Sequence, residues 1–179
     1  MTVREARESD AAAIIAYIHE NQDHYRYMIS KTAEMKLDQK YEKKMICLHA
    51  ERENCVFFIA LKGKKVLGML NFVGGNRSRD KHDGEFGLSV HKEQFGMGIG
   101  TMLVENLMRW GQKNQVIKRM TLFVMHSNNR AIKLYQRFGF NIEGVRRKAV
   151  RFEDGRIQDL IMMGILKKEG SDEWIDARQ

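Results

Sequence analysis

The sequence contains no proline, two cysteines and no long apolar run. Without proline, turns must be made by other residues, and the 15 glycines are the first candidates. Cys47 and Cys55 are too few for a disulfide framework, which favours a reducing compartment. No run approaches the roughly 20 apolar residues of a membrane span, and the N-terminus lacks the apolar core of a signal peptide. We therefore expect a cytoplasmic protein that makes no contact with a membrane.

Length and composition predict one folded domain. The chain has 179 residues, of which 43% are apolar and 30% are charged, as in globular proteins. We expect one domain over residues 1–168 and a polar tail over residues 169–179. The 31 basic and 23 acidic residues give a net charge of +8, which favours an anionic partner. Because the basic residues are spread along the chain, nucleic acid is not the expected partner.

Hydrophobic periodicity predicts strands and helices in the order β-α-α-β-β-β-α-β-α-β-β. The second helix is predicted to bury one face, made of Leu37, Tyr41, Met45 and Leu48. A third, amphipathic helix begins at Ile99 with a plausible end at Gly111, and the fourth is capped by Gly139. This order predicts an α/β (α+β) fold with a mixed central sheet flanked by helices.

A turn rich in glycine separates a predicted strand from the third helix. It contains Gly96, Gly98 and Gly100, and backbone N–H groups at such a helix N-terminus bind phosphate. A tight turn without a ligand is the alternative. The spacing excludes a dinucleotide-binding G-x-G-x-x-G motif, because the sixth position is Thr101. It also excludes a phosphate-binding loop of the Walker type, because no lysine precedes Thr101.

Two segments together resemble the acetyl-CoA-binding core of the GNAT N-acetyltransferase superfamily. Residues 95–100 read Phe-Gly-Met-Gly-Ile-Gly, where the family has Arg/Gln-x-x-Gly-x-Gly/Ala. Residues 128–140 match the second family segment, N-x-x-A-x-x-x-Y-x-x-x-G-F, in full. The C-terminal half is similar to the branch of ribosomal-protein N-terminal, spermidine and amino-acid N-acyltransferases. Phe95 departs from the family pattern, which puts the affinity for the cofactor in question.

The resemblance implies an enzyme with the GNAT acyl-CoA N-acyltransferase fold that moves the acetyl group of acetyl-CoA to a primary amine in a ternary complex. The cofactor would contact the strand before the turn, the turn itself and the fourth helix: Leu88, Ser89, Val90, Phe95, Gly96, Met97, Gly98, Ile99, Gly100, Thr101, Asn128 and Tyr135. A backbone N–H near Leu88 would polarise the thioester carbonyl. Tyr135 would protonate the departing thiolate, unless it is a packing tyrosine.

Glu85, on the strand before the turn, is the best candidate for the general base that deprotonates the amine. A surface carboxylate is the alternative, and His82, Asp83 and His91 are weaker candidates. The other histidines lack the spacing of metal ligands, so no metal is expected. The family resemblance implies that residues 21–32 shape the acceptor pocket with the last hairpin, and that a homodimer is possible. A CoA-binding sensor without turnover is the competing function, and the sequence does not identify the amine.

Overall fold

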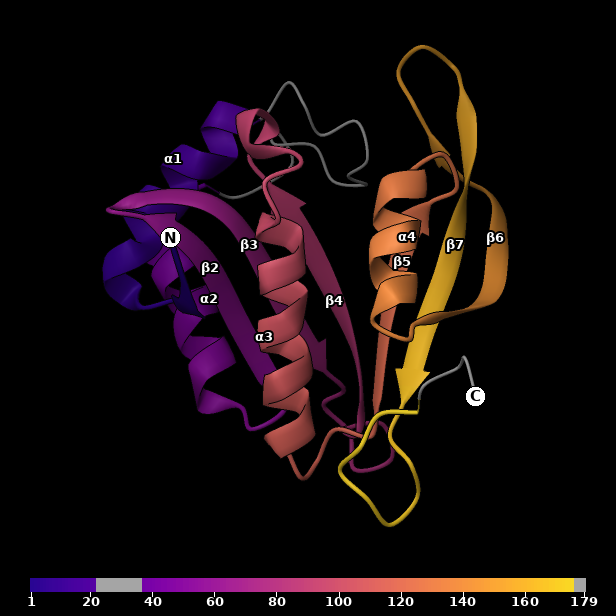
Figure 1. Cartoon of the computed structure of the whole chain (residues 1–179). Coiled ribbons are helices and arrows are strands. Elements are labelled where there is room, and N and C mark those ends of the chain that lie inside the picture. Colours follow the sequence, from indigo (N-terminus) through magenta and orange to yellow (C-terminus); the bar gives the residue numbers. More distant parts are fainter. Residues whose placement is uncertain (22–36, 176–179) are drawn as a thin grey trace.

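The computed structural model describes residues 1–21 and 37–175 (Figure 1). The elements are β1 (Thr2–Glu5), η1 (Glu8–Asp10), α1 (Ala11–Asn21), α2 (Gln39–Glu51), β2 (Cys55–Lys62), β3 (Lys65–Gly74), β4 (Asp83–Val90), η4 (Lys92–Gln94), α3 (Ile99–Lys113), β5 (Arg119–Met125), α4 (Asn129–Arg137), β6 (Asn141–Arg151) and β7 (Ile157–Leu166). This confirms the predicted order of helices and strands and the mixed α/β class. None of the described helices is both long and apolar enough to cross a membrane.

The seven strands form one sheet in the order β1-β2-β3-β4-β5-β7-β6. Its neighbouring strands are antiparallel, except for the parallel pair of β4 and β5 at the centre. β4 pairs with β3 over residues 84–90, and β5 pairs with β7 over residues 119–125. β4 and β5 pair with each other only at residues 83–85 and 119–121. The two strands therefore separate after a short common stretch.

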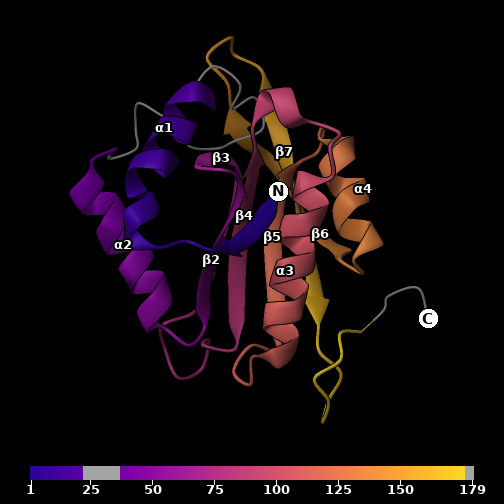
Figure 2. The same ribbon diagram turned by 60° about the vertical axis from the view of Figure 1, so that its left-hand side comes forward.

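Helices cover both faces of this sheet (Figures 1 and 2). α3 and α4 pack on one face, around the larger cluster of buried side chains. α1 and α2 pack on the other face, over β3 and β2. β2 lies between the two layers, so that Phe58 belongs to one cluster and Phe57 and Ile59 to the other. Burial on both faces explains why residues 55–61 form a continuous apolar run.

The buried face of α2 differs from the predicted one. Tyr41 and Leu48 are each 39% exposed, whereas Glu42, Ile46 and His49 are buried. The His49 ring packs against Phe57 with the ring centroids 5.5 Å apart, and its Nδ1 is bonded to a carbonyl oxygen one turn earlier. The prediction considered apolar residues alone, whereas α2 buries the imidazole of His49 against the sheet.

The end of α3 also differs from the prediction. The helix continues past Gly111 to Lys113, and Gly111 is buried against Met120 and Trp174. A Cβ atom at Gly111 would lie 2.7 Å from the Trp174 ring, so this glycine permits close packing rather than ending the helix. The Lys167 ammonium has no exposed surface, and it donates to the Asn114 carbonyl at 2.8 Å. The chain after β7 thus packs against the C-terminal end of α3.

A substitution at Gly84 tests the close packing of β4 against β3. The Gly84 backbone has an ordinary strand conformation, but a Cβ atom would overlap the Phe72 ring, with Cε1 at 2.6 Å, and would lie 2.9 Å from the Val73 carbonyl oxygen. Gly84→Ala is therefore expected to lower the free energy of unfolding by about 1–3 kcal/mol through overpacking. The measurement is urea unfolding followed by circular dichroism.

Gly87→Ala is the matched control on the same strand, because its Cβ would meet only the flexible Asn71 side chain, at 3.2 Å. We expect a change within about 0.5 kcal/mol for this variant. Equal unfolding midpoints for the two variants would contradict the packing at Gly84.

Candidate active site

The turn before α3 is built to present backbone N–H groups. Gly96 and Gly98 have φ angles of 92° and 79°, which L side chains rarely adopt, and Gly98 is the N-cap of α3. The first intrahelical bond runs from the Met102 amide to the Gly98 carbonyl at 3.0 Å. The amides of residues 99–101 therefore have no partner within the helix and point toward its N-terminal end. Such a terminus, with its helix dipole, attracts a phosphate group.

Two residues of the predicted turn already use their amides. The Phe95 amide donates to Lys92 O at 3.3 Å, and the Met97 amide donates to Gln94 O at 3.2 Å. The side chains of Phe95 and Met97 are 55% and 62% exposed. These two residues shape the turn, whereas the amides of the following residues stay available to a ligand.

α4 brings two arginines to this turn that the sequence analysis did not identify. The Arg130 guanidinium lies over the Phe95 ring, 5.4 Å from its centroid. Arg137 donates to the Thr101 hydroxyl at 3.3 Å. Their spacing of seven residues places them on the same face of the helix, and this spacing was the available signal. The turn thus has positive side chains beside it although Phe95 stands where the family pattern has Arg or Gln.

The edge of β4 that faces β5 carries unused backbone groups. The Thr121 hydroxyl donates to Gly84 O at 3.0 Å, so Gly84 turns its carbonyl toward β5. The His91 amide donates to Leu67 O of β3 at 2.8 Å. Because backbone groups alternate along a strand, Leu88 and Val90 turn their N–H and C=O toward β5, which by then has diverged. In the described chain, no strand pairs with this edge beyond Glu85.

Ser89 lies between these two positions and faces α1. Its hydroxyl accepts a hydrogen bond of 2.9 Å from the Tyr17 hydroxyl. Its side chain therefore connects β4 to α1, and its backbone pairs with Met69 of β3. Of the three predicted cofactor-binding residues of β4, Leu88 and Val90 turn their backbone groups toward the gap between β4 and β5.

Tyr135 lies on the α3–α4 side of β4. Its ring makes edge contacts with Phe86 and Phe140, at centroid distances of 5.6 Å and 6.1 Å. Burial strongly raises the pKa of the phenol, because the phenolate would lose its hydration. The hydroxyl is therefore protonated throughout the neutral range, and among the described residues it has no hydrogen-bond partner. Such a group keeps its proton and is suited to donate a hydrogen bond.

Asn128 is the N-cap of α4. Its side-chain oxygen accepts a 3.2 Å hydrogen bond from the Ala131 amide. This contact explains the residue type at the start of the helix. The predicted contact of Asn128 with the cofactor would have to come from the amide nitrogen of the same side chain.

Glu85 projects from the opposite face of β4, because adjacent side chains alternate across a strand and Phe86 faces Tyr135. Partial burial raises the pKa of the Glu85 carboxyl, nearby Arg146 acts in the opposite direction, and Asp83 adds to the rise. Asp83 itself lies 3.5 Å from Arg119, which is also paired with Glu143. Glu85 and Tyr135 thus lie on the two sides of the sheet, near the place where β4 and β5 part.

The weaker base candidates are placed differently. His91 is buried, and its Nε2 lies 3.2 Å from a Glu20 carboxylate oxygen. Six residues of strand separate it from Glu85, or about 20 Å. His82 is exposed, and its carbonyl accepts from the amides of residues 118 and 119. The predicted acceptor segment, residues 21–32, lies outside the described part of the chain except for Asn21.

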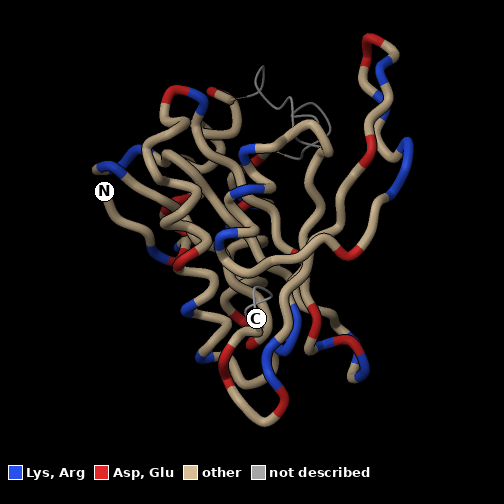
Figure 3. Tube along the Cα trace, turned by 45° about the vertical axis from the view of Figure 1, so that its right-hand side comes forward, with Lys and Arg blue, Asp and Glu red and all other residues tan. Residues whose placement is uncertain are grey.

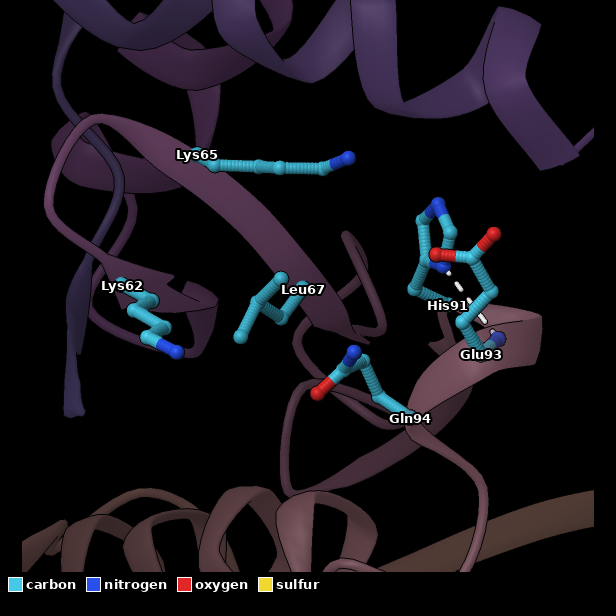
Figure 4. A pocket seen from close by; sticks show the side chains of 6 residues that line it. All are labelled: Lys62, Lys65, Leu67, His91, Glu93 and Gln94. Carbon is cyan, nitrogen blue, oxygen red and sulfur yellow. Dashed lines mark hydrogen bonds between the residues drawn. The ribbon is translucent and has the colours of Figure 1, made fainter.

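A pocket of about 340 Å³ opens beside the start of the turn (Figure 4). It is lined by Lys62, Lys65, Leu67, His91, Glu93 and Gln94. Figure 4 shows the lining side chains coming from the β2–β3 hairpin on one side and from η4 on the other. Neither Glu85 nor Tyr135 lines this pocket, so it is distinct from the gap between β4 and β5. Within residues 1–21 and 37–175, no group of three or more acidic, histidine or cysteine side chains is placed to hold a metal ion.

Comparison with known protein families shows which family the chain belongs to. The model of the acetyltransferase (GNAT) family matches residues 15–140. The chain belongs to this family. It is accordingly an N-acetyltransferase that uses acetyl-CoA as its co-substrate, and nothing found supports a sensor without turnover. The features of this acetyltransferase suit acetyl-CoA. The turn and the free edge of β4 offer backbone N–H donors, and α4 adds the positive charge of its arginines.

Three similar proteins extend the comparison. The acetyltransferase is 27% identical to the L-amino acid N-acetyltransferase AaaT of Escherichia coli (strain K12) over 118 residues, 66% of this chain and 72% of AaaT. A GNAT-family acetyltransferase from Streptococcus pneumoniae is 27% identical, with a TM-score of 0.88 over 92% of this chain and 98% of that one. A phosphinothricin acetyltransferase from Sinorhizobium meliloti, solved with acetyl-CoA, shares the fold at 19% identity. Its TM-score is 0.79 over 96% of this chain and 91% of that one.

Proposed function

We propose that the acetyltransferase holds acetyl-CoA along the free edge of β4, with Tyr135 on one side of the reacting thioester and Glu85 on the other. The observation that carries this proposal is the separation of β4 from β5 after residue 85. It leaves backbone donors exposed between a protected phenol and an accessible carboxylate. The amine approaches from the side of Glu85, and the thiol leaves toward Tyr135.

Each group has one task in the transfer. The Glu85 carboxylate takes a proton from the incoming ammonium, directly or through water, so that the amine nitrogen can bond to the acetyl carbon. The Leu88 N–H donates to the thioester oxygen as negative charge develops there. As the carbon–sulfur bond breaks, the Tyr135 hydroxyl gives its proton to the sulfur. The nitrogen loses its second proton as the amide forms, and this proton returns through water to the Tyr135 oxygen. The high pKa of this phenol keeps the proton available until the thiolate forms.

The turn and α4 supply the binding energy for the phosphates. The amides of residues 99–101 would bind the pyrophosphate, and Arg130 would add a charge-assisted hydrogen bond from α4. This arrangement compensates for Phe95, whose ring supports the Arg130 guanidinium. We propose a small primary amine as acceptor, and the name of AaaT favours an amino acid. A homodimer and a cytoplasmic location stay predictions.

Arg130→Ala tests the contribution of α4 to cofactor binding. Loss of a hydrogen bond to a charged group removes about 1.5–3 kcal/mol, so the Kd for acetyl-CoA is expected to rise at least 10-fold. Isothermal titration calorimetry at fixed ionic strength measures this change. Arg109→Ala, on the exposed side of α3, is the control and should leave the Kd near the parent value. Equal affinities for both variants would refute the role of Arg130.

Tyr135→Phe tests the proton donor. Without the hydroxyl, kcat is expected to fall about 100-fold, the lower end of typical acid–base contributions. Because the ring stays in place between Phe86 and Phe140, the Kd for acetyl-CoA should change little. Release of free thiol with an excess of amine reports the rate. A variant as fast as the parent at every pH would show that Tyr135 only packs.

Glu85→Gln tests the general base through the pH profile. Glu85 must be deprotonated to act, and its pKa is raised, so kcat/KM should rise with pH through that pKa. The acidic limb of the parent is therefore expected above the normal range of a glutamate. In Glu85→Gln this limb should be lost and the rate reduced about 100-fold. Glu105→Gln, exposed on α3, is the control; an acidic limb that persists in Glu85→Gln would assign it to another group.

A further inference from the structure

The face of the sheet that carries Glu85 continues beyond α1 and α2. These helices pack over β2 and β3, whereas β5, β7 and β6 extend past them (Figures 1 and 2). By strand alternation Phe123 of β5 faces the same side as Glu85, since Thr121 pairs with Glu85. Met162 pairs with Phe123 across the strands, and both side chains are partly exposed. An apolar strip therefore begins next to the proposed base.

Arg146 of β6 reaches over this strip. Its guanidinium lies 5.5 Å from the centroid of the Phe123 ring, and its charge acts on the Glu85 carboxyl. Within the described part of the chain Arg146 forms no ion pair. Arg119, on the same face, is paired with both Asp83 and Glu143. Arg146 is thus held above an aromatic ring with its charge available to an incoming anion.

Strand pairing and a hydrogen bond hold the backbone on either side of Arg146. Arg146 pairs with Leu160 of β7, and the register shifts between Arg146 and Val150. In this bulge Lys148 has a φ of 54°, and its amide donates to Asp159 at 2.7 Å. Figure 3 shows both basic and acidic residues along this projecting hairpin. Bulges are common beside functional sites, where they set the direction of a side chain.

We propose that Arg146 binds the carboxylate of a free α-amino acid acceptor and selects such acceptors over amines that lack a carboxylate. This inference rests on the proposed function, because Glu85 must receive the amine. An α-amino acid carries its ammonium and carboxylate on one carbon. The Glu85 carboxyl and the Arg146 guanidinium above Phe123 lie on the same face of the sheet and can receive these two groups. Its side chain would then lie over Phe123 and Met162, which favours apolar amino acids.

The experiment compares amino acids with amines of the same side chain. L-leucine is paired with 3-methylbutylamine, and L-phenylalanine with 2-phenylethylamine, and thiol release gives kcat/KM for each. Since a charge-assisted bond is lost in the amine, the parent should prefer each amino acid by about 10- to 100-fold. In Arg146→Gln this ratio should fall about 10- to 100-fold relative to the parent. Arg146→Lys should keep an intermediate ratio.

Arg151→Gln is the matched control, because Arg151 is exposed and pairs with Ile157 beyond the bulge, at the far end of β6. Its ratio should equal that of the parent. Differences in amine basicity, and any effect of Arg146 on Glu85, cancel when ratios are compared between variants. The dipeptide Leu-Gly, whose amine stands next to an amide, should behave as the amine does.

The outcomes separate the two proposals. Transfer to amines with the same ratio in the parent and in Arg146→Gln overturns the role of Arg146 but leaves the proposed function standing. Acetylation of Leu-Gly as efficiently as L-leucine also overturns it, in favour of a peptide N-terminus. If no amine is acetylated, the proposed function fails. Calorimetry of L-leucine against the protein with CoA then decides on Arg146, because absence of binding, or binding unchanged in Arg146→Gln, overturns the assignment.

Discussion

The proposed active site depends on backbone hydrogen bonds that β4 cannot make within the sheet. A strand at the centre of a sheet normally satisfies both edges, and unpaired buried groups are costly. β4 is fully paired with β3, but β5 leaves it after three residues. The donors and acceptors at Leu88 and Val90 must then be satisfied by water or by an extended polar molecule. The amide groups of a pantetheine arm suit that need, since they supply the hydrogen bonds of a missing strand.

The same separation allows the two proposed catalytic groups to have opposite properties. Tyr135 is packed among aromatic rings, where burial raises its pKa and keeps the proton on the phenol. Glu85 lies on the open face, where water can carry a proton away and charged neighbours adjust its pKa. A continuous sheet would keep these two environments apart. In the proposed arrangement both act on one thioester at the parted strands, so acid and base need not compete for the same side of the reacting carbon.

Sequence patterns predicted the fold and the turn well, because strand order and glycine positions follow from local rules. Gly98 has the left-handed backbone that its place before a helix requires. The interpretation was wrong where burial depends on a partner elsewhere, as for Leu48 and for the end of α3 at Gly111. Arg130 and Arg146 were given no role at the site for the same reason. The spacing of Arg130 and Arg137 puts them on one face of a helix, but the position of that face beside the turn, and that of Arg146 above Phe123, depends on tertiary packing.

Backbone amide exchange, measured by NMR with and without acetyl-CoA, tests the central claim most directly. Ser89 and His91 turn their amides toward β3, so they should exchange slowly in both states. Leu88 and Val90 turn theirs toward the gap, so these should exchange rapidly alone and slowly when acetyl-CoA is bound. The amides of residues 99–101 should be protected with them. Saturating acetyl-CoA that leaves Leu88 and Val90 unprotected would contradict the account.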